Sequence, residues 1–141
     1  MPSRLTVTGW SVVLGFMIDS ACADVVVVVP QHSPVERLSR EQVMDIYLGR
    51  LTRLSDGTPV VPIDQREGST TYREFYQQYL GQSPAQIKAH WSKLIFTGHG
   101  QPPRSVADDS AVADAVSQTR HAIGYLDPDF VDARLRVVAV E

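Results

Sequence analysis

This sequence has almost no cysteine and no excess of basic charge. Cys22 is the one cysteine among 141 residues, so a disulfide framework and a cysteine-based zinc cluster are both excluded. Thirteen Lys and Arg residues stand against 16 Asp and Glu, which gives a formal net charge of −3. A nucleic-acid-binding domain is expected to carry a basic excess instead. Apolar residues make up 43% and charged residues 21%, so the composition indicates one globular domain rather than a disordered chain.

The sequence also lacks an apolar run long enough for a membrane-spanning helix. Its longest largely apolar stretch, from Leu5 to Ile18, has 14 residues, whereas a spanning helix needs about 18 or more. Arg4 precedes this stretch, and Ala21-Cys22-Ala23 follows it as a small-x-small pattern. We therefore expect a secretory signal over residues 1–23, cleaved near Ala23, and a periplasmic mature chain without a transmembrane segment. An uncleaved anchor or a buried helix is the alternative.

Strand and helix signals alternate along the rest of the chain. The valine run that begins at Val25 has no polar alternation, which is typical of a strand buried on both faces. Ser39 with Gln42, and Ser83 with Gln86, form two capping boxes that each predict the start of a helix. We expect strands over 24–30, 60–63, 122–126 and 135–140, and helices after 39, over 70–80, after 83 and over 110–119. This order predicts an α/β domain over 24–141, with a central sheet of about four to five strands flanked by helices.

The segment from Arg66 to Arg73 is the main candidate for chemistry, because it follows a strand and opens a helix. A helix N-terminus presents backbone N–H groups without intrahelical partners, so an anion can bind there. Gly68 allows close approach of the backbone, and three hydroxyl groups and two guanidinium groups add donors. The candidate ligand-binding residues are Arg66, Gly68, Ser69, Thr70, Thr71 and Arg73. The simpler interpretation is that Ser69 or Thr70 only caps the helix and Gly68 makes the turn.

Other chemistry-bearing residues give weaker signals. The histidines show no metal-ligand spacing and no HExxH pattern, so we expect no metal and no cofactor. They are His32, His90, His99 and His121. Ser69 could form a hydrolase triad with His99, but no GxSxG pattern surrounds it. Asp108 and Asp109 are interpreted as charge at a helix N-terminus. The helix over 70–80 carries four aromatic residues, Tyr72, Phe75, Tyr76 and Tyr79. We expect most of them to lie in the core or at its edge, and Tyr72, at the start of the helix, to be able to reach a ligand.

Three segments, in this order, resemble the phosphate-binding periplasmic proteins of ABC transporters. Residues 38–50, LSREQVMDIYLGR, resemble the LS-x-x-Q-x-x-x-IF-x-GK stretch of that family. Residues 62–75, with GSTT at 68–71, resemble its strand and its Ser/Gly/Thr-rich phosphate loop. Residues 122–126, AIGYL, resemble its GAIGYV strand. The resemblance implies one lobe of a type II periplasmic-binding-protein fold.

The phosphate loop departs from the family pattern, which reads Arg-x-Asp-Gly-Ser-Gly-Thr. Here the second glycine is missing, Glu67 replaces the aspartate, and Arg66 is displaced by one position. By the resemblance Ser69 and Thr70 are phosphate ligands. The 118 residues from 24 to 141 amount to about one of the two lobes in that family, and a single lobe leaves a ligand half exposed.

The sequence therefore predicts an exported, non-enzymatic solute-binding protein. Its ligand would be phosphate or a related oxyanion, and its partner an ABC permease in phosphate transport. The alternative is a periplasmic interaction or sensory module that docks on a membrane receptor, with Tyr76 or Tyr79 as exposed contact residues. A small periplasmic hydrolase acting through Ser69 is the third hypothesis.

Overall fold

The computed structural model describes residues 24–141, and the predicted signal at 1–23 lies outside them. The strands are β1 Val26–Pro30, β2 Arg37–Leu38, β3 Val61–Gln65, β4 Arg104–Val106, β5 Ala122–Leu126 and β6 Leu135–Val140. The α-helices are α1 Arg40–Tyr47, α2 Thr70–Phe75, α3 Pro84–Phe96 and α4 Asp109–Gln118. A π-helical segment, η1 Tyr76–Leu80, continues α2, and η2 Pro128–Phe130 is a 3₁₀ turn.

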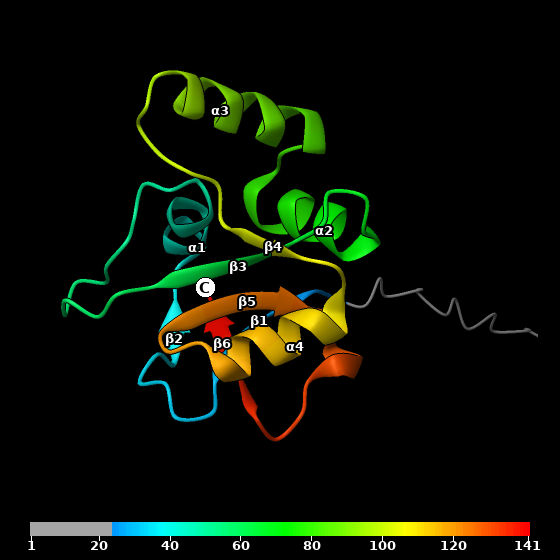
Figure 1. Ribbon diagram of the computed structural model, residues 1–141. Coiled ribbons are helices and arrows are strands. Elements are labelled where there is room, and N and C mark those ends of the chain that lie inside the picture. The colour runs from blue at the N-terminus through cyan, green and yellow to red at the C-terminus, as the bar shows by residue number, and fades with distance from the viewer. Residues whose placement is uncertain (1–23) are drawn as a thin grey trace, which may run out of the picture.

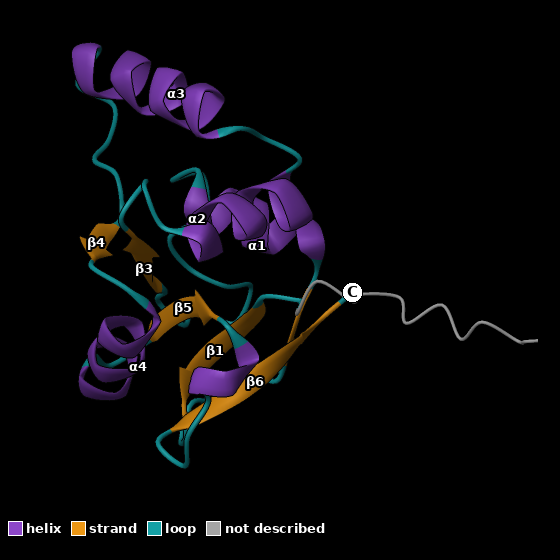
Figure 2. Cartoon of the chain, turned by 90° about the vertical axis from the view of Figure 1, so that its right-hand side faces the viewer, coloured by secondary structure: helices purple, strands orange, loops and turns teal. Residues whose placement is uncertain are grey.

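The strands form one six-stranded mixed sheet in the order β2-β6-β1-β5-β3-β4. β1 lies near its middle and is antiparallel to both neighbours, with Val27 opposite Tyr125 of β5 and Val138 of β6. β3 is parallel to β5 and to β4, and β2 is parallel to β6. Figures 1 and 2 show α1 and α2 on one face of the sheet and α4 on the other. The predicted α/β class, a central sheet flanked by helices, is confirmed.

Two short edge strands account for the difference from the predicted four to five strands. β2 has two residues and β4 has three, and neither shows an apolar alternation. β2 begins at Arg37, after the largely polar segment 31–36. β4 begins at Arg104, after the Gly- and Pro-rich loop over 98–103. Backbone pairing to β6 and β3 forms these strands, so side-chain patterns carry little signal for them.

The helix boundaries follow the local signals of the sequence. Both capping boxes form: Ser39 Oγ accepts the Gln42 N–H at 3.0 Å, and Ser83 Oγ accepts the Gln86 N–H at 3.3 Å. Gly81 ends the second predicted helix in the left-handed conformation, with φ of +62°. The one departure is that the turn before Gly81 is π-helical rather than α-helical. The predicted helices are therefore confirmed.

Apolar side chains fill both interfaces between the helices and the sheet. On the α1 and α2 face, Phe75 stacks on Tyr125 with ring centroids 3.8 Å apart. On the α4 face, Val112 and Val116 pack with Val28 and other buried residues. All five residues of β5 are buried, because helices cover the sheet from both sides.

Gly124 in β5 allows α4 to approach the sheet closely. A Cβ at this position would lie 2.6 Å from Val116 Cγ2 and 2.9 Å from Val112 Cγ1. We therefore expect Gly124→Ala to lower the free energy of unfolding by about 1–3 kcal/mol through overpacking. Urea denaturation of the full chain measures this change. Gly68→Ala is the control, since a Cβ at Gly68 would meet no atom within 4 Å; equal losses in both variants would contradict close packing at Gly124.

Candidate functional site

The loop between β3 and α2 ends in a capped helix N-terminus. Ser69 has extended backbone angles, and its Oγ accepts the backbone N–H of Tyr72 at 3.0 Å. The backbone N–H groups of Thr70 and Thr71 precede the first intrahelical bond and so have no partner within the helix. The helix cap, which is the simpler interpretation of Ser69, is therefore present. It does not by itself exclude a ligand at the same end of the helix.

An internal carboxylate lies beside this helix end. Asp109 Oδ2 accepts the Thr71 hydroxyl at 3.1 Å, and its Oδ1 accepts Gln65 Nε2 at 2.7 Å and the backbone N–H of Asp127 at 3.2 Å. The hydroxyl of Ser69 in turn donates to Gln65 Oε1 at 3.0 Å. The predicted donors on Ser69 and Thr71 are therefore used within the protein. Asp109 joins the start of α4 to the start of α2, which goes beyond the expected role of helix-end charge.

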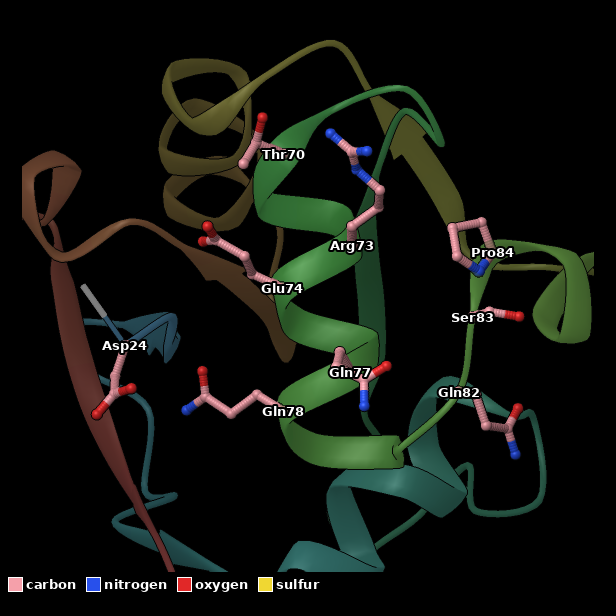
Figure 3. Close-up of a pocket in the computed structure, with 9 residues that line it drawn as sticks. All are labelled: Asp24, Thr70, Arg73, Glu74, Gln77, Gln78, Gln82, Ser83 and Pro84. Carbon is pink, nitrogen blue, oxygen red and sulfur yellow. The ribbon is translucent and has the colours of Figure 1, made fainter. Parts of the chain in front are cut away.

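Thr70 and Arg73 face outward and line a cavity of about 600 Å³. The other lining residues are Asp24, Glu74, Gln77, Gln78, Gln82, Ser83 and Pro84. In Figure 3 Thr70 and the Arg73 guanidinium lie at the N-terminal end of α2, while Glu74 and Gln78 extend toward Asp24. Arg66 and Gly68 are exposed in the loop before the helix. The structure thus brings Thr70 and Arg73 to one surface and separates them from the inward Ser69 and Thr71.

Sequence reasoning missed the other polar residues of this cavity. Glu74 and Gln78 follow Thr70 at spacings of four and eight, and Gln77 follows Arg73 at a spacing of four. These spacings place side chains on one helix face, so the signal was present in the predicted helix. Gln82 and Ser83 reach the cavity through the turn after Gly81, which no periodicity indicates.

A buried carboxylate supports the loop from below. Asp64 is 7% exposed, and its Oδ2 accepts the Tyr76 hydroxyl at 2.6 Å, while the Tyr125 hydroxyl and the Gln65 N–H donate to Oδ1. Burial raises the pKa of Asp64, and the tyrosine hydrogen bonds oppose that rise. Burial, and then the charge of Asp64, raise the pKa values of Tyr76 and Tyr125. The tyrosines therefore remain protonated donors to the carboxylate.

The alternative sites from the sequence are less well supported. Among residues 24–141 no group of three metal-ligating side chains comes together. Ser69 donates to an amide oxygen rather than to a histidine, so the arrangement lacks the base of a hydrolase triad. Tyr72 is 6% exposed, so little of its surface is accessible to a ligand.

The expectation that Tyr76 is an exposed contact residue is wrong. Tyr76 is fully buried against the aromatic core and bonded to Asp64. Tyr79 is half-buried, and its hydroxyl donates to the Val25 carbonyl at 2.8 Å. Among the described α-helices, the large exposed apolar residues lie instead at the end of α3, where Ile95 is 54% and Phe96 93% exposed.

Solved structures similar to this chain in fold include two that are named for phosphate transport. A Clostridium perfringens protein, assigned as a phosphate ABC transporter substrate-binding protein and crystallised with bound phosphate, matches with a TM-score of 0.65 at 21% identity over 83% of this chain. An ABC-type phosphate transport receptor from Vibrio cholerae matches with a TM-score of 0.64 at 20% identity over 83% of this chain. PstS from Borrelia burgdorferi matches with a TM-score of 0.58 at 15% identity over 84% of this chain.

The likeness is one of fold. This chain spans 44%, 46% and 47% of the lengths of those three proteins, respectively. No protein-family model matches the sequence, and no curated protein is significantly similar to it. Within residues 24–141 no helix has the length and apolar character needed to cross a bilayer. The predicted resemblance is thus supported at the level of the fold, over less than half of each neighbour.

The raised pKa of Asp64 makes the stability of the protein depend on pH. A carboxyl whose pKa is higher in the folded than in the unfolded state binds more protons when folded, so stability falls as pH rises from about 4, the unfolded pKa. We expect Asp64→Asn to remove this fall, which has a slope of at most about 1.4 kcal/mol per pH unit for one group.

Urea denaturation between pH 4 and pH 8 provides the measurement. The asparagine variant should be less stable than the parent by a margin that narrows as pH rises, because only the parent loses the contribution of the protonated carboxyl. Glu36→Gln, at an exposed position near the opposite sheet edge, is the matched control. Parallel pH profiles for the parent and Asp64→Asn would contradict the proposed shift.

Proposed function

We propose that this chain is a non-enzymatic solute-binding lobe that recognises phosphate or a related oxyanion at the N-terminal end of α2. The observation that carries the proposal is that the Thr70 hydroxyl and the Arg73 guanidinium line one cavity at a capped helix N-terminus. A hydroxyl, a guanidinium and a helix N-terminus are together the donors that an oxyanion requires. The fold neighbours that act in phosphate transport support the same class of ligand.

In this proposal the six predicted residues have different roles. Thr70 and Arg73 contact the anion directly, and Arg66 and the exposed backbone at Gly68 approach it from the loop. Ser69 and Thr71 act as positioning residues, because their hydroxyl groups are already bonded to Gln65 and Asp109. Ser69 holds the helix N-terminus in place rather than donating to the ligand.

Carboxylates near the cavity favour an anion that carries a proton. Glu74 and Asp24 line the cavity with Arg73, and Asp109 lies behind the helix end. Hydrogen phosphate can donate its proton to a carboxylate, whereas sulfate has no proton at neutral pH and would only be repelled by these carboxylates. We therefore propose phosphate over sulfate. We also propose weak binding by the isolated chain, because a ligand on one lobe keeps much of its surface in water.

The place proposed for this activity is the periplasm. The fold of the neighbours and the predicted signal over residues 1–23 support export, and the partner proposed is an ABC permease. A partner that covers the open side of the cavity would remove water from the anion and strengthen each hydrogen bond. The isolated chain is in this view the incomplete half of a binding site.

Calorimetric titration of the full chain with phosphate tests the proposed site. Thr70→Ala combined with Arg73→Gln should lower the affinity at least tenfold, because it removes a hydroxyl donor and a charged donor. Both side chains are exposed, so the free energy of unfolding should change by less than about 0.5 kcal/mol. Lys93→Gln, an exposed cation on α3, is the charge-matched control. Unchanged phosphate affinity in the double variant would rule out this site.

Asp109 provides a second test, in the opposite direction. Asp109→Asn removes a negative charge from the helix end that should hold the anion, while the amide keeps an oxygen that can accept from Thr71 or Gln65. We expect phosphate to bind roughly two- to tenfold more tightly, as a nearby like charge at intermediate dielectric predicts. Titrations of Asp109→Asn and of Glu36→Gln, which is far from the site, give the comparison. Equal phosphate affinity in the two variants would place the anion away from Asp109.

One observation favours the interaction module as a second candidate function. Ile95 and Phe96 are adjacent, exposed apolar residues at the end of α3, and such residues are typical of protein contacts. If the chain gives no heat with millimolar phosphate, docking through this end of α3 becomes the better-supported function.

A further inference from the structure

A second cavity, of about 410 Å³, lies between α3 and the body of the protein. Figure 1 shows α3 lying beyond α1, with the segment after it returning along the molecule to β4. Aliphatic and aromatic side chains of α1, of α3 and of the loop between α1 and β3 line the cavity, among them Ile46, Leu51, Val60, Trp91 and Leu94. Its volume lies in the range typical of small-molecule sites, about 300–1,000 Å³. It is separate from the cavity at α2, with which it shares no lining residue.

The walls of this cavity are held in place. A Cβ at Gly49 would lie 2.7 Å from Trp91 Cη2, so the indole ring packs directly on the backbone there. His90, the neighbour of Trp91, contacts the Leu48 carbonyl through Nε2 at 3.0 Å. These contacts fix α3 to the end of α1 and fix the orientation of the indole.

The Trp91 indole borders the cavity through its ring and not through its N–H group. Trp91 is 7% exposed, and its Nε1 is buried without a hydrogen-bond partner within the part of the chain that the structure describes. An atom with almost no accessible surface cannot be reached from the cavity, so the indole contributes apolar ring surface to the cavity wall.

The charge around the cavity has one sign. His99 and Arg104 are its titratable lining residues, and none of its lining residues is acidic. Within residues 24–141 no salt bridge joins Arg104 to a carboxylate. An apolar interior with a free guanidinium at its border is complementary to a molecule with a hydrocarbon body and an anionic end.

We propose that this cavity binds an aliphatic carboxylate, such as a medium-chain fatty acid. The hydrocarbon chain packs on Leu51, Leu94 and the Trp91 ring, and the carboxylate accepts hydrogen bonds from the Arg104 guanidinium. An alcohol of equal length lacks the charge for Arg104, and an alkylammonium ion would be repelled by it. The site is independent of the proposed anion site at α2, and its test does not rely on phosphate binding.

Titration of the full chain with sodium decanoate, below the concentration at which it forms micelles, tests the proposal. The chain has two tryptophans, Trp10 and Trp91, so a ¹⁵N–¹H spectrum contains two indole N–H signals, and Trp91→Phe identifies the second. We expect saturable displacement of the Trp91 signal, because the hydrocarbon chain packs against the indole ring. Decanoate should bind with the same affinity when phosphate is present.

Arg104→Gln and Arg53→Gln form the matched pair of variants. Both arginines are exposed, and Arg53 lies outside the cavity lining. Arg104→Gln should weaken decanoate binding about tenfold, the size expected for loss of a charge-assisted contact, and Arg53→Gln should leave it unchanged. Decanol should bind the parent chain about tenfold more weakly than decanoate.

Three results would overturn the proposal. One is a Trp91 indole signal that does not move with decanoate. Another is equal decanoate affinity in the Arg104 and Arg53 variants, which would remove the guanidinium from the site. The third is decanol or decyltrimethylammonium binding as tightly as decanoate, which would show an apolar surface without selectivity for a carboxylate.

Discussion

A strand with apolar side chains on both faces must be covered on both faces, and β1 imposes this constraint on the whole domain. Val27, Val28 and Val29 are buried, which requires helices above and below the sheet. α1 and α2 cover one face and α4 the other. Burial also requires that neighbouring strands satisfy the backbone of β1, and β5 and β6 do so from its two sides. The remaining elements extend this covered centre.

The polar end of the sheet depends on that centre. Asp64, near the end of β3, accepts hydrogen bonds from Tyr76 of η1 and Tyr125 of β5. The next residue, Gln65, is hydrogen-bonded to both Ser69 and Asp109. The starts of α2 and α4 are therefore joined through side chains that are themselves buried or half-buried. A rigid arrangement of this kind presents Thr70 and Arg73 at fixed positions. Preorganised donors of this kind bind a ligand with little cost in ordering.

The sequence predicted those features that local patterns determine. The capping boxes at Ser39 and Ser83 and the end of the helix predicted over 70–80 each depend on residues within a single turn, and all three form as expected. The buried strand β1 was predicted because a continuous run of valines is typical of a strand that is buried on both faces. The outline of the fold followed from these elements and from the resemblance of three segments to a known family.

The features that depend on distant parts of the chain were not predictable in this way. Asp109 is 44 residues from Gln65, so no local pattern links them, and the edge strands β2 and β4 form through pairing alone. The error at Tyr76 has a different cause. The four aromatic residues of this helix have the spacing of one helix face: Tyr72, Phe75, Tyr76 and Tyr79. This spacing predicts that they are buried together, and a buried Tyr76 cannot serve as an exposed contact residue.

The sparse attachment of α3 has a consequence for the energetics of the domain. Only Ile87 and Trp91 of its 13 residues are buried, whereas every residue of β5 is buried. Segments with few buried apolar contacts open at a lower free energy than the core does. Partial unfolding should therefore begin at α3 and leave the sheet intact, so that its backbone amides exchange with solvent through local opening while those of β1 and β5 exchange only when the whole domain unfolds.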